Sequence, residues 1–317
     1  MEPIFPLLKL PKNVIIQVLQ STDGNELFII SLISSKTKRL VTSLGIEARE
    51  IGISIYCKIS VLVRTTKFRL TLDVYDASSY LPVDITLPVA AYFEYQKPIK
   101  PSTPFNFSDW LNHIQTVFCW TKPTNVYFCQ GCERFEVKYL NEAIGNVNTL
   151  FLTGLVTANA SRKILKHFNS PRELVLFQNP FGEVCQIQQI FIQNFDIIDF
   201  DAVYSLDDML LVNSEKIDFT RPTTQKQFNK FLKHWIRGSN PRLQFLSLII
   251  DATETVDGEI YLKGIKCIGM REDAKREIRR KHSLSVNVDM IQIRRKDGTA
   301  AVIATEKSEN IHFIVLD

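Results

Sequence analysis

The sequence predicts an α+β protein with a helical N-terminus, a β-sheet unit, an irregular α/β repeat region and a C-terminal β-hairpin. Three observations lead to this fold class. Apolar residues follow helical spacing near the N-terminus, alternate strictly from Ile51 onward, and recur as short pairs between helical stretches after residue 105. The helical N-terminus is predicted at 1–45, the β-sheet unit with its linker at 46–104, the repeat region at 105–270, and the basic helix with the C-terminal hairpin at 271–317.

The N-terminal segment predicts three short helices with an excess of apolar surface. Pro11 suits the first turn of a helix, where its missing N–H costs no hydrogen bond. Leu27 and Leu32 belong to a second helix, and residues 36–40 form a basic third one. A unit of about 40 residues buries too small a share of its area to hide this surface. The segment therefore docks onto a partner or, alternatively, packs as a cap on the protein's own core.

This helical pattern resembles the F-box. The matching residues are Leu7, Leu8, Leu10 and Pro11 at the entry, Val14, Ile15, Val18 and Leu19 in the first helix, and Leu27 and Leu32 in the second. Asp23-Gly24 stands where the usual pattern has aspartate-proline, and the third helix lacks the usual tryptophan. The resemblance implies that these residues bind a Skp-family adaptor, which links the chain to a cullin ubiquitin ligase.

The β-sheet unit is predicted from alternating apolar residues. Residues 51–63 alternate without a break and predict one long strand, and residues 68–74 predict its hairpin partner. Residues 83–87 and 91–95 suggest two further strands. The proline-rich stretch 97–104 predicts a linker.

The region after the linker predicts strands that alternate with helices. A helix capped by Ser108 comes first, and further helices are expected at 159–168 and 224–237. The predicted strands are Val126-x-Phe128, Leu150-x-Leu152, Leu174-x-Leu176, Ile190-x-Ile192, Met209-x-Leu211 and Leu246-x-Leu248. This repeat is typical of a degenerate leucine-rich-repeat-like solenoid.

The middle residue of each predicted strand should point to the open face of the sheet. These residues are Tyr127, Phe151, Val175, Phe191, Leu210 and Ser247, and all but the serine are apolar or aromatic. An exposed stripe of this kind normally marks a contact surface. It either binds a protein target or is covered by another part of the chain, and the sequence leaves both interpretations open.

The C-terminal part predicts a basic helix over 271–281 and a hairpin that turns at Asp297-Gly298. A further strand is expected at 311–316, and we expect this C-terminal hairpin to pair with the sheet of residues 51–95. Three segments resemble the type 2 F-box-associated domain of nematode proteins: Trp235 to Leu243, residues 206–218 and residues 291–303.

Few residues have the pattern of a chemical site. Cys129 and Cys132 form a Cys-x-x-Cys pair, but no second pair completes a zinc site and no clear helix follows to stabilise a thiolate. Asp196, Asp199 and Asp201 lack the glycine turn of a calcium loop and suggest a solvated segment. The sequence thus predicts no metal, no cofactor and no catalysis.

Composition sets the remaining limits. The net charge of +4 is too small to indicate a nucleic-acid or membrane partner, and no apolar run could span a bilayer. Without a secretory signal, the six cysteines indicate reduced thiols and a cytoplasmic or nuclear location. The leading hypothesis is a non-catalytic substrate receptor of a Skp–cullin–F-box ligase with an unknown protein target. The alternative is a leucine-rich-repeat-like interaction module outside a ligase, and an enzyme built on Cys129 and Cys132 is a distant third.

Overall fold

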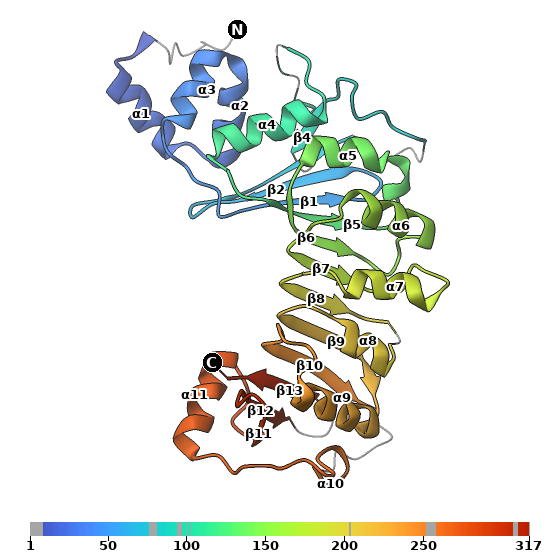
Figure 1. The fold of residues 1–317 in the computed structure, drawn as a ribbon. Helices are drawn as coiled ribbons and strands as arrows, with labels where there is room; N and C mark the ends of the chain where they lie inside the picture. The colour runs from blue at the N-terminus through green and yellow to red at the C-terminus, as the bar shows by residue number, and fades with distance from the viewer. Residues whose placement is uncertain are drawn as a thin grey trace. The chain divides into compact units, whose positions relative to one another are not determined.

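The chain consists of two compact units, residues 1–171 and residues 172–317. The computed structural model describes residues 9–75, 81–93, 97–99, 101, 103–202, 204–251, 258–306 and 310–316. Both units combine helices with a β-sheet (Figure 1), so the fold is a mixed α+β one, as predicted.

Three helices open the first unit, as the apolar spacing predicted. They are α1 (Lys12–Ser21), α2 (Gly24–Ile33) and α3 (Ser35–Thr42). Asp23 caps α2 by accepting hydrogen bonds from two backbone N–H groups. Ser34 separates α2 from α3 and forms a capping box with Thr37. The starts of α2 and α3 therefore have local side-chain causes, whereas α1 begins after Pro11 without a side-chain cap.

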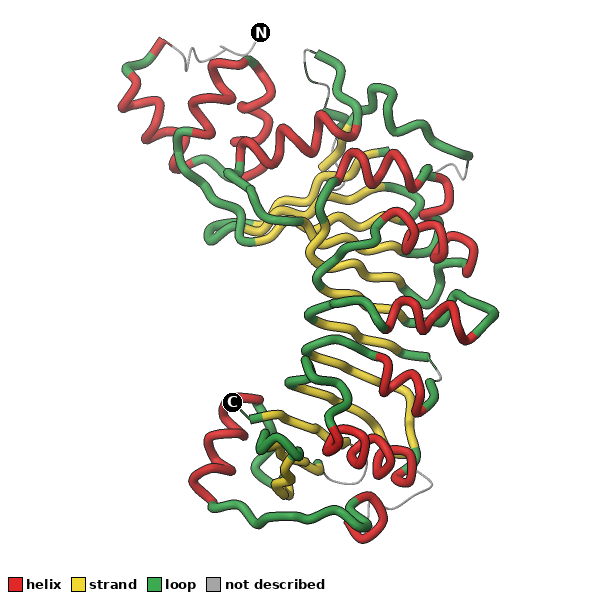
Figure 2. Tube along the Cα trace, viewed as in Figure 1, coloured by secondary structure: helices red, strands yellow, loops and turns green. Residues whose placement is uncertain are grey.

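The sheet of the first unit has the strand order β6-β5-β1-β2-β3-β4. The strands are β1 (Glu50–Ile55), β2 (Ile59–Arg64), β3 (Arg69–Val74), β4 (Ala91–Phe93), β5 (Thr124–Phe128) and β6 (Val147–Leu152). The first four pair antiparallel, whereas β1, β5 and β6 pair parallel. Helices α4 (Phe107–Val117), α5 (Val137–Ile144) and α6 (Ala158–His167) accompany the strands, and a short 3-10 turn, η2, spans Cys132–Arg134 (Figure 2).

Three predictions for this unit were wrong in detail. The long strand of residues 51–63 is two strands, because the chain reverses at residues 56–58, where the Tyr56 N–H donates to the Lys58 carbonyl. Residues 83–87 form only one bridge, between Val83 and Phe135, and no strand. The cap of α4 is Asn106 and not Ser108. The predicted linker 97–104 lies partly outside the described residues.

The second unit has the strand order β7-β8-β9-β10-β13-β12-β11. Its strands are β7 (Glu173–Leu176), β8 (Ile197–Phe200), β9 (Lys216–Thr223), β10 (Phe245–Ile250), β11 (Asp289–Arg294), β12 (Ala300–Thr305) and β13 (Asn310–Val315). Its helices are α7 (Val184–Phe191), α8 (Leu206–Leu211), α9 (Gln225–Arg237), α10 (Gly258–Tyr261) and α11 (Glu272–His282). Strands β7 to β10 are parallel and alternate with helices, which confirms the alternation but leaves the leucine-rich-repeat-like classification a prediction.

Two strand predictions in this unit were wrong. Ile190 lies in α7, which ends at Phe191, and Met209 lies in α8, so both apolar pairs contribute to helices. The strands that follow them are β8 and β9, which contain Asp199 and Asp218. Asp199 therefore lies in a strand and not in the predicted solvated segment.

The C-terminal hairpin forms as predicted but pairs elsewhere. Strands β11 and β12 are antiparallel, and Gly298 at their turn has a φ of 97°. β13 pairs with β10 of the same unit, so the expected pairing with residues 51–95 was wrong. The basic helix α11 packs Ile278 against Val288, Met290, Val302, Ala304 and Ile314, which covers one face of this part of the sheet.

Candidate functional site

The second helix of the F-box-like segment is anchored in the core of the first unit. Phe28 is fully buried, and its ring lies 6.0 Å from Phe93, 6.3 Å from Trp110 and 6.3 Å from Phe118, measured between ring centroids. Aromatic groupings of this kind add to the free energy gained by burial. Part of the apolar excess of the N-terminal segment is therefore covered by the protein's own core.

A buried hydrogen bond accompanies this anchor. The Ser31 hydroxyl lies 2.7 Å from Nε2 of His113 on α4, and the His113 ring packs edge-on against Phe28. Burial, together with the nearby charge of Lys38, lowers the pKa of His113 to about 4. The imidazole is thus neutral at physiological pH and suits a packed interior.

Gly24 explains one departure from the usual F-box pattern. Its α-carbon faces the ring of Phe68 in the turn between β2 and β3, and a Cβ added there would lie 2.3 Å from that ring. The Phe68 ring in turn packs against Phe118, with centroids 5.9 Å apart. The proline of the usual pattern would collide with this ring, so glycine allows α2 to approach the sheet.

The predicted adaptor-binding residues fall into two groups. Ile15, Leu19, Leu27 and Leu32 are buried and hold the three helices together, with at most 9% of each residue exposed. Pro11 and Val18 are exposed, Leu10 and Val14 are half-buried, and all four can be touched by a partner. Leu7 and Leu8 lie outside the described residues.

Two exposed residues of α2 were missed by the sequence comparison with the F-box pattern. Ile29 is 41% exposed and Ile33 is 62% exposed, on a helix whose other face carries Phe28. Their spacing of four residues places them on one side of the helix. The available signal was the apolar run of α2, whose residues lie on more than one side of the helix and so indicate that both faces are used.

A groove of about 530 Å³ lies between α1 and α3. Leu10, Ile15 and Leu40 supply its apolar lining. Lys12, Lys36 and Arg39 also line it, and no acidic residue does. This combination favours a partner surface that is apolar and negatively charged.

The predicted target-binding residues are not all on the open face of a sheet. Tyr127 and Phe151 are neighbours in the register of β5 and β6, are half-buried, and have ring centroids 5.5 Å apart. Val175 is half-buried in β7. Phe191 is fully buried in α7 and Leu210 is half-buried in α8, so their predicted placement on the sheet was wrong.

Cys129 and Cys132 flank a turn in which Gly131 has a φ of 91°. Burial raises the pKa of the Cys129 thiol and raises that of Cys132 to about 12, so both thiols are protonated at neutral pH. η2, which begins at Cys132, is too short to stabilise a thiolate. Within the described residues, no group of three or more His, Cys, Asp or Glu side chains could hold a metal ion.

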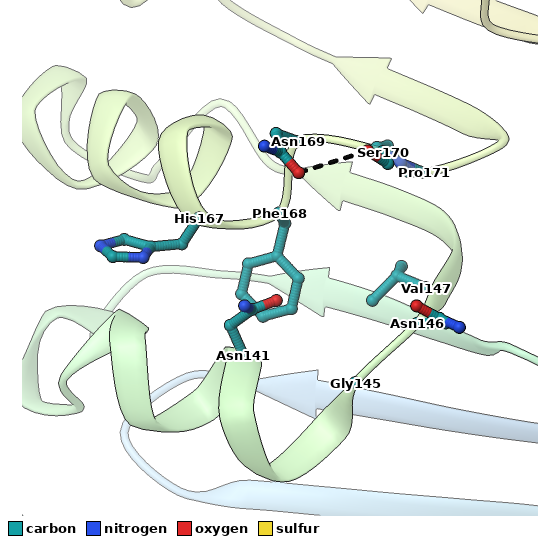
Figure 3. A pocket seen from close by; sticks show the side chains of 9 residues that line it. All are labelled: Asn141, Gly145, Asn146, Val147, His167, Phe168, Asn169, Ser170 and Pro171. Carbon is teal, nitrogen blue, oxygen red and sulfur yellow. Dashed lines mark hydrogen bonds between the residues drawn. The ribbon is translucent and has the colours of Figure 1, made fainter.

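A polar pocket of about 250 Å³ lies where α5 meets β6 and α6 reaches its C-terminus (Figure 3). It is lined by Asn141, Gly145, Asn146, Val147, His167, Phe168, Asn169, Ser170 and Pro171. The Ser170 hydroxyl donates to the Asn169 side chain, at 3.3 Å, and not to His167. The pocket thus lacks the hydroxyl–imidazole pairing of a nucleophilic site.

Comparisons with known proteins identify two segments of the chain. Residues 7–48 match the F-box domain family, and residues 186–248 match the F-box-associated family. The chain therefore carries one segment similar to the F-box and one similar to the F-box-associated domain, and both resemblances predicted from the sequence are confirmed. It is similar to the F-box associated domain-containing protein sdz-33 of Caenorhabditis elegans, with 22% identity over 244 residues that cover 75% of this chain and 76% of the relative.

No solved structure matches this chain. In the part of the chain that the structure describes, no helix has both the length and the apolar character needed to cross a bilayer.

Proposed function

We propose that this chain is a non-catalytic substrate receptor of a Skp–cullin–F-box E3 ubiquitin ligase. F-box domains as a class bind Skp-family adaptors, and the single observation that supports adaptor binding here is the division of the N-terminal helices into two surfaces. Phe28 anchors α2 to the core, while Val18, Ile29 and Ile33 stay exposed. Exposed apolar side chains on an anchored helix pair are suited to a stable protein contact.

The adaptor contact in this proposal combines apolar and charged groups. Leu10, Pro11, Val14 and Val18 supply the apolar part, with Leu7 and Leu8 preceding them in the chain. The cations that line the groove between α1 and α3 would steer an acidic adaptor surface. The cullin is reached only through the adaptor.

Target binding is the second part of the proposal. The half-buried pair Tyr127 and Phe151 offers aromatic surface on the sheet of the first unit, and Val175 offers a smaller apolar site in the second. A target bound there gains ubiquitin through a raised effective concentration near the ligase, without chemistry by this chain. Phe191 is no longer proposed as a target-binding residue because its side chain is fully buried.

Adaptor capture tests the proposal directly. The full chain is co-purified with a Skp-family adaptor, and the same is done with Val18→Asp. Val286→Asp is the matched control, because Val286 is 79% exposed in the second unit. We expect the parent and the control to retain the adaptor and Val18→Asp to lose most of it. A parent chain that captures no Skp-family adaptor would refute the ligase assignment.

A second candidate function is an interaction module that does not engage a ligase. The burial of Phe28 against Phe93, Trp110 and Phe118 favours it, because a cap on the protein's own core needs no adaptor. The two candidates differ in the outcome of adaptor capture. They agree in predicting a protein target.

A further inference from the structure

In β7 to β10, the sheet face opposite α7, α8 and α9 carries two aspartates where the sequence predicted an apolar stripe, and α11 packs on the β10 end of this face. The part of this face that α11 leaves free is called the open face. Residues that alternate with the buried core positions of β7 to β10 are Val175, Asp199, Asp218 and Ser247. These four are direct neighbours in the strand register. Aspartates replace the expected apolar residues because β8 and β9 begin seven residues after Ile190 and Met209, where the strands had been predicted to begin.

Asp199 and Asp218 lie directly abreast on two neighbouring parallel strands. Like charges in this position destabilise a sheet. No ion pair in the described part of the chain includes either carboxylate, whereas nearby Asp201 is paired with Arg221 at 3.3 Å. Burial raises the pKa of Asp199 to about 6, and the charges of Asp218 and Asp201 add to this shift. Ser247 and His312 compensate part of the charge of Asp218, whereas no described ion pair compensates Asp199.

Half-buried apolar groups flank the two carboxylates. Ile197 precedes Asp199 by two positions in β8, and Phe245 precedes Ser247 by two in β10, so both lie on the same face. Helices α7, α8 and α9 cover the opposite face, where Phe191 meets Phe200 and Trp235 meets Phe313. Acidic groups with apolar neighbours match the side chains of lysine and arginine, which combine an apolar stem with a charged end.

Other charged groups on this face limit where a cation can bind. Lys216 lies at the start of β9, abreast of Ile197 and Phe245. His312 lies abreast of Ser247, and burial lowers its pKa, so it is neutral at physiological pH. Glu173 in β7 also lies on this face, abreast of Ile197. Helix α11 packs over the β10 end of the face, where the His282 ring stacks on Phe245 and Lys281 lines the same pocket as Lys216. The acidic part of the face is therefore bounded by basic groups on the β10 side.

We propose that this open sheet face, centred on Asp199 and Asp218, binds a segment of the target protein that presents lysine or arginine side chains. The inference rests on the proposed function as a substrate receptor and names the chemical class of its target. Charge complementarity selects this occupant, because a cation placed between the two carboxylates removes the repulsion that the free face retains.

The test uses a fluorescein-labelled peptide of six Lys-Ala repeats and the purified full chain in a polarisation titration. The net charge of +4 opposes general attraction of this peptide, so binding reports a local acidic surface. The variant is Asp199→Asn with Asp218→Asn. The control is Glu277→Gln with Asp289→Asn, which removes the same charge from two exposed positions of the same unit.

We expect the face variant to weaken binding by about tenfold or more and the control to stay within about twofold. Binding should also weaken in 0.5 M salt, because the contact is electrostatic. Absent binding by the parent, or an equal loss in both variants, would overturn the proposal. Adaptor capture measured on the same preparations separates the two proposals, since its failure would refute the receptor function and leave the peptide result standing.

Discussion

Replacing Asp199 by asparagine should stabilise the protein at neutral pH. Asparagine keeps the shape of the side chain and removes the charge that opposes Asp218 in the neighbouring strand. In the folded chain the pKa of this carboxyl is about 6, compared with an ordinary value of 3.8. The folded state therefore binds the proton more tightly than the unfolded state, and the ionised carboxylate destabilises the fold.

The size of the effect follows from this shift. Two pKa units correspond to about 3 kcal/mol for a fully buried group. Because Asp199 is only half-buried, solvent screening reduces this to about 1 kcal/mol. A gain of about 1 kcal/mol raises the Tm by about 2–4 °C in a chain of this size class.

The pH dependence provides the sharper measurement. The penalty is complete above pH 6 and disappears as the pH falls towards 3.8, since the folded state is then already protonated. We expect the Tm gain of Asp199→Asn at pH 7.5 to shrink to about a third at pH 4.5. Glu277→Gln is the control, with a change of less than about 1 °C. A lower Tm for Asp199→Asn at pH 7.5, or a gain that does not change with pH, would refute the like-charge argument.

Three further predictions concern the two cores. Gly24→Ala should cost about 1–3 kcal/mol, because its Cβ would meet the Phe68 ring, and chemical unfolding measures the loss. Phe191→Ala should cost about 3–5 kcal/mol and Phe151→Ala less than half of that, because the first residue is fully buried and the second is not; equal losses in denaturant titrations would contradict this placement. As the pH falls from 6.5 to 4.5, the protein should lose about 2 kcal/mol of stability through His113, because its pKa is about 4 in the folded state and 6.5 in the unfolded state, so that only the unfolded state takes up the proton. The variant His113→Gln should show a weaker dependence of thermal unfolding on pH, and an unchanged slope would disprove this role of His113.

Periodicity predicted much of the fold because most elements have one buried face. Helix α9 was found from the 3.6-residue spacing of its apolar residues and from Gly238, which ends it with a φ of 120°. The C-terminal hairpin was found from the Asp297-Gly298 turn. In both elements the local pattern and the tertiary environment agree, so the sequence alone was sufficient.

The wrong strand predictions occurred where the local apolar pattern is compatible with both a strand and a helix. Ile190-x-Ile192 and Met209-x-Leu211 fit a strand, but the same residues also fit one face of a short helix. The true strand β8 was hidden because Asp199 interrupts its apolar residues. The reversal at residues 56–58 lacks glycine, proline and asparagine, and it is held partly by the Lys58–Asp73 ion pair, which no local pattern reveals.

The candidate adaptor site was predicted in part for a related reason. A motif comparison names the residues that make up the F-box, but it does not separate those that build the domain from those that face a partner. Leu19 and Val18 are adjacent in the sequence, yet Leu19 is 1% exposed and Val18 is 39% exposed. Only the packing of α2 on α4 shows which side of the segment remains open.

The anchoring of Phe28 makes the F-box an inseparable part of the first unit. Removing residues 1–45 would leave Phe93, Trp110 and Phe118 without the ring that they surround, so a truncated chain should aggregate and not simply lose one partner. The same contact holds α2 within the compact unit that also carries the aromatic pair Tyr127 and Phe151. A target bound at that pair, as proposed, would therefore contact the same compact unit that carries the F-box, so loss of the F-box helices would remove both contacts.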